Sequence, residues 1–209
     1  MCMKILLTLL PVFIISLSIN SYAQDMDEDL IGGSFTDKLW VGANVGVSEP
    51  WGDPGTGGFY VTGFALKSFG QYDLSDKVNN LIFELSIGFS TWAAYSGNGS
   101  ATVIPILVNG VYKLTDIMPE ISVFMYGGIG FNLHSWDTDF DDSDIVSQSN
   151  LGINLGIGGS YPINPQFDLN LRVGYYLSFI SSRETDGSKV DKDYGHSESP
   201  IMLGVTYKL

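Results

Sequence analysis

Charged residues are scarce in this sequence, and no basic patch stands out among them. Of the 209 residues, 16% are charged, and the formal net charge is −13. Because nucleic-acid binding needs a basic surface to meet phosphates, we exclude that class of protein. A single cysteine, Cys2, excludes a disulfide scaffold. The body of the chain also lacks an apolar run of the ~20 residues that a membrane helix needs.

Apolar residues and glycine, in contrast, are abundant. Hydrophobic residues make up 44% of the chain and aromatic residues 13%, and there are 25 glycines. This content is too high for a disordered chain. We therefore expect an ordered fold of about one domain.

The first 23 residues have the pattern of a secretory signal peptide. Lys4 supplies the positive charge, an apolar stretch runs from Ile5 to Ile19, and Ser21-Tyr22-Ala23 is a small-x-small cleavage site. A membrane anchor is the alternative interpretation of this segment. Residues 24–36, with an acidic cluster and a glycine pair, are predicted to be a flexible leader.

From residue 37 to residue 209, apolar residues alternate with small or polar ones. This period of two is the pattern of a β-strand with two different faces. Eight segments show it, an even number of a length that suits a membrane barrel. The predicted strands are 39–48, 58–72, 81–90, 101–114, 120–133, 151–158, 167–179 and 201–209.

The two faces differ in residue size more than in charge. One face is aliphatic and aromatic, and the other is mostly glycine, serine and asparagine. Small residues suit the interior of a narrow barrel, whereas large apolar residues suit lipid. We therefore predict an all-β fold, an eight-stranded antiparallel up-and-down transmembrane β-barrel, for 37–209. A soluble sandwich or lipocalin-like barrel, with the apolar face inside, is the alternative.

Connection lengths favour the membrane barrel. The turns at 73–80, 115–119 and 162–166 are short, and they alternate with connections that include the longest. Outer-membrane barrels have short turns on the periplasmic side and long loops outside the cell. The longer set is 49–57, 93–100, 134–148 and 180–199. Four tyrosines near the short-turn end, predicted to face outward, fit an interfacial girdle: Tyr72, Tyr112, Tyr161 and Tyr207.

Two sequence motifs add a resemblance. The stretch from Ile104-Pro105-Ile106-Leu107 to Tyr112-Lys113-Leu114 leads through a short turn to Phe124-Met125-Tyr126-Gly127-Gly128-Ile129-Gly130-Phe131. This pattern resembles the bacterial outer-membrane β-barrel domain family, also called porin-like small outer membrane proteins. The chain end, with Gly204, Tyr207 and Leu209, is similar to the signal read by the barrel-assembly machinery. The resemblance implies a location in the bacterial outer membrane, in contact with its lipid.

Three charged residues are predicted to face the lumen: Lys67, Glu84 and Arg172. If the hairpin after the second strand centres near residues 75 and 76, paired residue numbers sum to about 151, and Lys67 lies opposite Glu84. Buried charges need partners. We expect these from Asn44, Asn154, Tyr126 and Tyr176. The cluster is interpreted either as a static plug or as a gate.

Other candidates for chemistry are few. The segment Asp137–Asp144 has carboxylates at alternate positions, which suits a cation such as Ca²⁺ or simply a solvated loop. His134 and Ser135 at the rim, with His196 and Glu198 in the last loop, resemble in residue type the His/Ser/Glu site of the lipid A deacylases found among eight-stranded barrels. Adjacent residues of a strand point to opposite faces, which argues against that site.

We predict no catalytic, cofactor or metal site, and no cofactor. The expected function is that of a non-enzymatic outer-membrane protein with a structural, adhesion or surface-interaction role through its extracellular loops. A narrow porin is the first alternative and a lipid A-modifying enzyme the second. The extracellular partner stays open. Pro105, which cannot donate to a strand ladder, is expected at a rim or a bulge.

Overall fold

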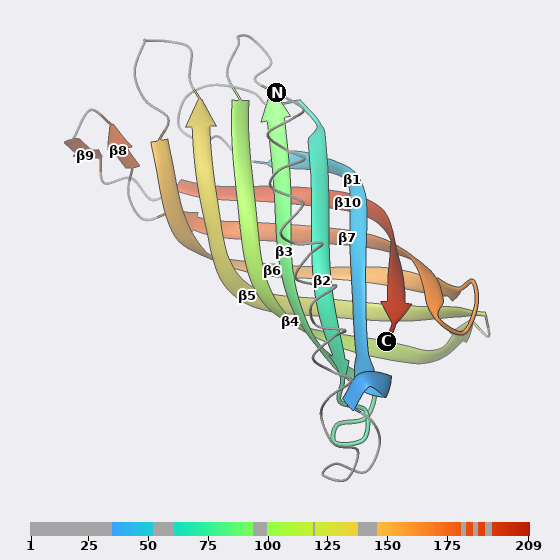
Figure 1. Ribbon diagram of the computed structural model, residues 1–209. Coiled ribbons are helices and arrows are strands. Elements are labelled where there is room, and N and C mark those ends of the chain that lie inside the picture. The colour runs from blue at the N-terminus through green and yellow to red at the C-terminus, as the bar shows by residue number, and fades with distance from the viewer. Residues whose placement is uncertain are drawn as a thin grey trace.

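The computed structural model describes residues 35–51, 61–93, 100–118, 120–137, 146–180, 183–185, 188–190 and 194–209. These residues form a closed antiparallel β-barrel with the strand order β1-β10-β7-β6-β5-β4-β3-β2 (Figure 1). The barrel strands are β1 (Leu39–Trp51), β2 (Gly63–Asp73), β3 (Leu81–Ala93), β4 (Ser100–Met118), β5 (Ile121–Asp137), β6 (Val146–Pro162), β7 (Phe167–Ile180) and β10 (Tyr194–Lys208). The predicted fold class, an eight-stranded up-and-down barrel, is confirmed.

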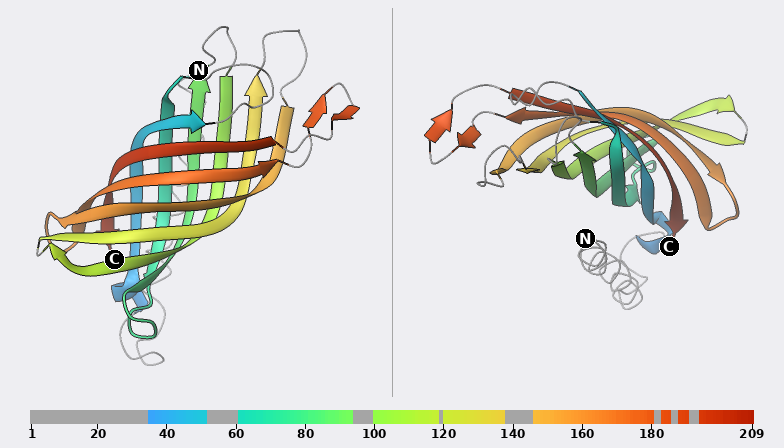
Figure 2. Two further views of the ribbon diagram at one scale, coloured as in Figure 1. Left: turned by 180° about the vertical axis from the view of Figure 1, so that it is seen from behind. Right: turned by 90° about the horizontal axis from the view of Figure 1, so that it is seen from above.

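Two small elements complete the described structure. The 3-10 helix η1 (Phe35–Lys38) precedes β1, and β8 (Arg183–Thr185) pairs with β9 (Ser188–Val190) in a hairpin of its own. Figure 2 places this hairpin at the opposite end of the barrel from η1 and the C-terminus. None of the described helices has the length and apolar character to cross a membrane. The predicted signal peptide at 1–23, and the leader as far as residue 34, lie outside the described residues.

Strict alternation of burial shows which face is inside. In β3, Ile82, Glu84 and Ser86 are buried, whereas Phe83 and Leu85 are exposed. The glycine-, serine- and asparagine-rich face therefore lines the lumen, as predicted, and most large apolar side chains point outward, although Phe69, Trp92 and Phe124 are among those that point inward. The physical reason is space, because an eight-stranded barrel leaves room inside only for side chains.

The outward apolar residues form a band of the right height for a bilayer. On β5 they run from Val123 to Leu133. At ~3.3 Å per residue and a tilt of about 40°, this stretch spans ~25 Å, the height of the apolar band in outer-membrane barrels. The four tyrosines of the predicted girdle lie on the outward-facing register, one residue from the ends of β2, β6 and β10 and six residues before the end of β4. Of its members, Tyr112 and Tyr161 are exposed, at 41% and 49%.

The strands are longer than predicted at the end away from the short turns. β5 continues to Asp137, and β10 begins at Tyr194 instead of near residue 201. His196 and Glu198, predicted in the last loop, therefore belong to the barrel wall. The turn between β4 and β5 is shorter than the predicted 115–119, because residues 115–118 belong to β4. Polar residues at these strand ends broke the apolar alternation on which the prediction relied.

Pro105 lies at neither a rim nor a bulge, which corrects the prediction. It is buried, it faces the lumen, and it is the sixth residue of β4. Pairing with β3 is interrupted at this point, yet Ile87↔Ile106 and Ser90↔Val103 keep one register on both sides. The ring packs against Gly88 of β3, where a Cβ would lie 2.8 Å from Pro105 Cγ. The missing glycine side chain thus makes room for the proline.

The barrel closes near the chain ends. β1 pairs with β10 from Trp40↔Lys208 to Trp51↔Ser197, and the Leu209 N–H donates to the Leu39 carbonyl at 3.0 Å. Lys38 of η1 donates to Asp76 in the β2–β3 turn at 2.8 Å. This hydrogen bond raises the pKa of Lys38 and lowers the pKa of Asp76. Both groups are solvent-accessible, so the pair positions η1 more than it stabilises the barrel.

Gly130 of β5 is a position where the barrel has no room for a side chain. A Cβ there would lie 1.9 Å from the carbonyl oxygen of Ile106 on β4. We expect Gly130→Ala to lower the free energy of unfolding by about 1–3 kcal/mol, because the strands must separate to relieve the overlap. Gly70 is the matched control, since nothing lies within 4 Å of its Cβ position. Urea unfolding in detergent should show no loss for Gly70→Ala, and equal effects at both sites would contradict the argument.

Candidate functional site: the barrel lumen

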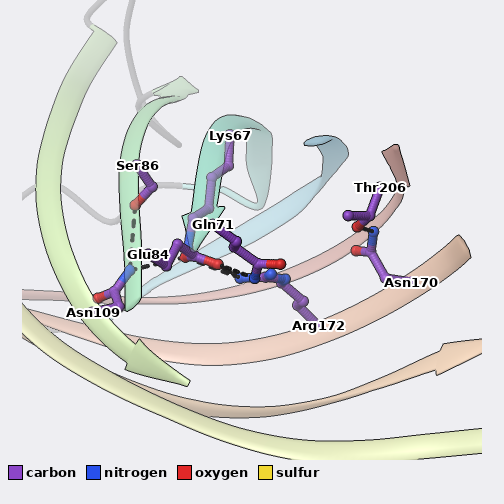
Figure 3. Close-up of polar contacts among 8 residues, drawn as sticks. All are labelled: Lys67, Gln71, Glu84, Ser86, Asn109, Asn170, Arg172 and Thr206. Carbon is purple, nitrogen blue, oxygen red and sulfur yellow. Dashed lines mark hydrogen bonds and ion pairs between the residues drawn. The ribbon is translucent and has the colours of Figure 1, made fainter. Parts of the chain in front are cut away.

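The lumen holds a cluster of three buried charged side chains, Lys67 (β2), Glu84 (β3) and Arg172 (β7), here called the lumen cluster. Lys67 Nζ lies 2.9 Å from Glu84 Oε1, and Arg172 Nη1 lies 2.8 Å from Glu84 Oε2 (Figure 3). The exposed fractions of the three residues are 3%, 0% and 1%. The structure therefore brings together the three residues singled out in the sequence, with one carboxylate between two cations.

The register that joins them differs from the predicted one. The residue opposite Glu84 is Gln71, and the residue opposite Lys67 is Gly88, so paired numbers sum to 155 instead of 151. The reason is the β2–β3 turn, which extends over residues 74–80 and is centred two residues later than expected. Lys67 reaches Glu84 diagonally across the sheet, which its long side chain allows.

The hydrogen-bond partners of Glu84 also differ from those predicted. Gln71 Nε2 donates to Glu84 Oε2 at 2.8 Å, and Asn109 Nδ2 donates to Glu84 Oε1 at 2.9 Å (Figure 3). The side-chain amides of Asn44 and Asn154 were expected to be partners of the buried charges, but they make no hydrogen bond within the described part of the chain. Gln71 and Asn109 were missed because the predicted register did not place them beside Glu84.

Aromatic rings surround the guanidinium group of Arg172. Its Cζ lies 4.3 Å from the ring centre of Phe69, 5.2 Å from that of Phe124 and 5.4 Å from that of Tyr126. Lys67 Nζ lies 5.2 Å from the same Tyr126 ring. Tyr126 therefore contributes to the lumen cluster through its ring face, by cation–π attraction, and the aromatic rings fill the space around the charges.

A second group closes the lumen toward the longer loops. Trp92 (β3) and His196 (β10) lie with ring centres 5.2 Å apart, and His196 and His134 (β5) with ring centres 5.5 Å apart. All three rings are buried. β10 is three strands away from both β3 and β5 around the barrel, so these rings bridge the lumen. The prediction missed this group because it placed His196 in a loop. His196, Glu198 and Met202 are separated by even numbers of residues, which in a strand places all three side chains on one face.

The proposed His–Ser pair for lipid A chemistry is not assembled. His134 faces the lumen and is 2% exposed, whereas Ser135 lies on the outward register of β5. Glu198 is buried and accepts a hydrogen bond from Ser48 Oγ at 2.6 Å. Among the described residues, no three His, Cys, Asp or Glu side chains stand close enough to hold a metal ion. Of the segment Asp137–Asp144, weighed as a cation site or a solvated loop, the structure describes only the backbone at Asp137, and residues 138–144 lie outside the described residues.

A third group narrows the lumen at the end with the short turns. The ring of Trp40 lies between two lysines, with Lys113 Nζ at 4.4 Å and Lys208 Nζ at 5.5 Å from its centre. Lys113 pairs with Asp73 at 3.7 Å and Lys208 with Asp168 at 3.2 Å. These five residues come from five different strands, so side chains from several parts of the barrel wall meet at this end of the lumen.

The fold and the filled lumen define this chain as a small membrane β-barrel of the bacterial outer-membrane type. The family model described as the outer membrane protein beta-barrel domain matches residues 11–208. The chain belongs to this family, as its motifs indicated, and the protein is located in the bacterial outer membrane. No curated protein matches the sequence.

Solved structures share the architecture. Neisserial surface protein A has a TM-score of 0.56 and 19% identity, over 82% of this chain and 97% of that one. A major outer membrane protein from Thermus thermophilus has a TM-score of 0.55 and 20% identity, over 82% and 98%. Ail, the attachment invasion locus protein of Yersinia pestis, has a TM-score of 0.51 and 14% identity, over 82% and 97%. At these identities the likeness shows the fold alone.

Proposed function

We propose that this protein acts at the cell surface through its extracellular loops, in adhesion or another surface contact, and not as an open pore or an enzyme. The observation that carries the proposal is the filled lumen. Side chains cross it at three levels: the Trp40 group, the lumen cluster and the Trp92–His196–His134 group. A barrel of eight strands has no spare width around such side chains.

The extracellular loops are then the part available for contact with a partner. One of them is strongly acidic in sequence, with five aspartates between residues 137 and 144. A like-charged polyanion is disfavoured as a partner by repulsion, whereas a cationic surface is favoured. The names of two structural relatives, Neisserial surface protein A and the attachment invasion locus protein, agree with a surface role for this architecture.

Two processing steps belong to the same proposal. Residues 1–23 direct export and are removed, and the last residues of the chain, with Gly204 and Tyr207 of β10 and Leu209 after it, are recognised by the barrel-assembly machinery. The pairing of β10 with both β1 and β7 supports a closing role for this strand. Amino-terminal sequencing of the protein from outer membranes should begin at Gln24, and a start at Met1 would contradict the cleavage.

Orientation is tested by epitope tags on intact cells. A tag between β5 and β6, within residues 138–145, should be reached by antibody without permeabilisation, because this connection lies at the end with the longer loops. A tag at the β4–β5 turn, residues 119–120, should be detected only after permeabilisation. The reverse pattern would show that the barrel is inserted the other way round.

Conductance separates a surface protein from a narrow porin. We expect no large, steady conductance from the purified protein in planar bilayers, since three groups of side chains cross the lumen. Neutralising Glu84 alone should add little, because the Trp40 and Trp92–His196–His134 groups remain. Stable nanosiemens-scale channels would overturn the proposal and establish the porin alternative.

Loop dependence is tested in the same cells. Replacing residues 137–145 by a two-residue Asn-Gly turn keeps Trp136 paired with Val146 and should reduce attachment of expressing cells to cationic surfaces, because it removes the five aspartates of this loop. The heat-modifiable gel shift of the folded barrel should be unchanged in this variant. Undiminished attachment by every loop-shortened variant would contradict a loop-based function.

A further inference from the structure

One strand of the barrel extends past its neighbour at the end with the longer loops. Residues Val146–Asn150 of β6 pair with β5 on one side. On the other side, β6 pairs with β7 only from Leu151↔Phe179 onward, because β7 ends at Ile180. Among the described residues, no strand pairs with this second side of 146–150, which is here called the β6 edge.

The β8–β9 hairpin does not take the place of the missing neighbour. β8 comes near β6, and Figure 1 shows the hairpin beyond the outer end of this strand. However, β8 pairs only with β9, in a sheet separate from the barrel. In the part of the chain that the structure describes, the backbone N–H and C=O groups of the β6 edge thus have no sheet partner, and such groups are a template for an added strand.

The sequence of the β6 edge does not block strand addition. Proteins usually protect an unpaired edge with proline or with charged residues. β1 shows this at the same end of the barrel, because Glu49 and Pro50 belong to the three residues that extend past its pairing with β2. The β6 edge, Val146–Asn150, contains neither proline nor a charged residue. One overhanging strand is therefore protected against pairing, and the other is open to it.

Charge indicates which kind of strand fits this edge. The connection that leads into β6 has five aspartates between residues 137 and 144. A second copy of this chain, paired edge to edge, would bring two such acidic segments together, and their repulsion disfavours that occupant. A cationic polypeptide is attracted to the same place, and an extended backbone has the donors and acceptors that match a strand edge.

We propose that the β6 edge binds an extended, positively charged segment of a partner polypeptide, which adds to the sheet as a further strand beside β6. Backbone hydrogen bonds hold the segment in place, and the acidic connection attracts its charge. This inference rests on the surface role proposed above and specifies the place of contact and the chemistry of the partner.

The probe for the test is a fluorescent decapeptide of alternating lysine and threonine, titrated into the full protein in a nonionic maltoside detergent and followed by fluorescence anisotropy. Its matched control has N-methyl groups on the four central residues, which keeps every side chain and charge but removes backbone donors from both edges of the peptide. The control should bind more than about tenfold more weakly, because two or more backbone hydrogen bonds are lost. The probe should also slow hydrogen exchange at the amides of Val146–Asn150.

Proline substitutions locate the contact on β6. Neighbouring N–H groups of a strand point to opposite sides, so one of Gln148→Pro and Ser149→Pro removes a donor from the β6 edge, and the other removes one from the ladder with β5. The edge-facing variant should keep the heat-modifiable gel shift of the folded barrel and bind the probe at least about fivefold more weakly, since one backbone hydrogen bond is lost. Gln148→Ala and Ser149→Ala keep both N–H groups, and they should bind the probe as the original protein does.

Equal binding of the two peptides, or undiminished binding in every folded proline variant, would overturn the proposal. Protection of all five amides before the probe is added would also overturn it, because the β6 edge would then already be paired. Cells that express the proline variants should still attach to cationic surfaces, since the acidic connection is intact. Normal attachment without strand addition would remove this inference alone, whereas failure of the original protein to attach would remove the surface role itself.

Discussion

Glu84→Gln is expected to lower the free energy of unfolding by about 3–5 kcal/mol, because it leaves two buried cations without a carboxylate. Glu84 is fully buried and contacts both Lys67 and Arg172 within 3 Å. The amide keeps the size of the side chain but not its charge. Urea unfolding of the purified barrel in detergent, followed by Trp fluorescence and by gel shift, measures the difference.

Two further variants separate charge from packing. Glu49→Gln removes an exposed carboxylate near the outer end of β1, and its effect should stay below ~0.5 kcal/mol. Replacing all three members of the lumen cluster by apolar residues of similar volume should recover most of the loss, since a well-packed apolar group often substitutes for a buried ion network. A triple variant as unstable as Glu84→Gln would show that shape, and not charge balance, governs the site.

Val173→Arg is expected to cost about 2–4 kcal/mol, as does a cation at the bilayer midplane on the lipid face of a barrel. Val173 is 41% exposed on β7 and lies between Ile157 of β6 and Ile201 of β10, both of which point outward. Leu171→Arg, two residues away on the same face, should behave similarly. The measurement is equilibrium unfolding in lipid vesicles.

Phe167→Arg is the control for depth. Phe167 begins β7 at the short-turn end, and its ring lies 4.9 Å from that of Tyr207 in the interfacial girdle. An arginine there can reach the headgroups, so the expected cost is only ~0–1 kcal/mol. Equal costs at both positions would mean that this wall of the barrel does not face the hydrocarbon.

Much of this architecture was predictable because one physical constraint repeats along the chain. The lumen holds mostly small and polar side chains, with a limited number of large ones packed around the charges, and the bilayer accepts apolar ones, so the membrane-spanning strands share one alternation. Lys67, Glu84 and Arg172 were found by their place in that alternation. The strand ends were predicted less well, because outside the apolar band polar residues occur on both faces.

Contacts between strands were harder to predict. The residue opposite Glu84 is Gln71, and not Lys67 as predicted, because the β2–β3 turn is centred later than expected. A change in the position of a turn shifts every residue pair in its hairpin. The meeting of His134 with His196 depends on the curvature of the closed sheet, since these residues are 62 positions apart and their strands are separated by two others. No local pattern contains that information.

The sequence by itself determined the class of the protein: an eight-stranded barrel with its small face inside, its apolar face in lipid and its longer connections at one end. These features follow from local alternation and composition, which any stretch of the chain displays without its neighbours. Only the tertiary structure decided which lumen side chains meet, because barrel closure and register bring distant strands together. The three groups of side chains that cross the lumen exist only once that closure is made.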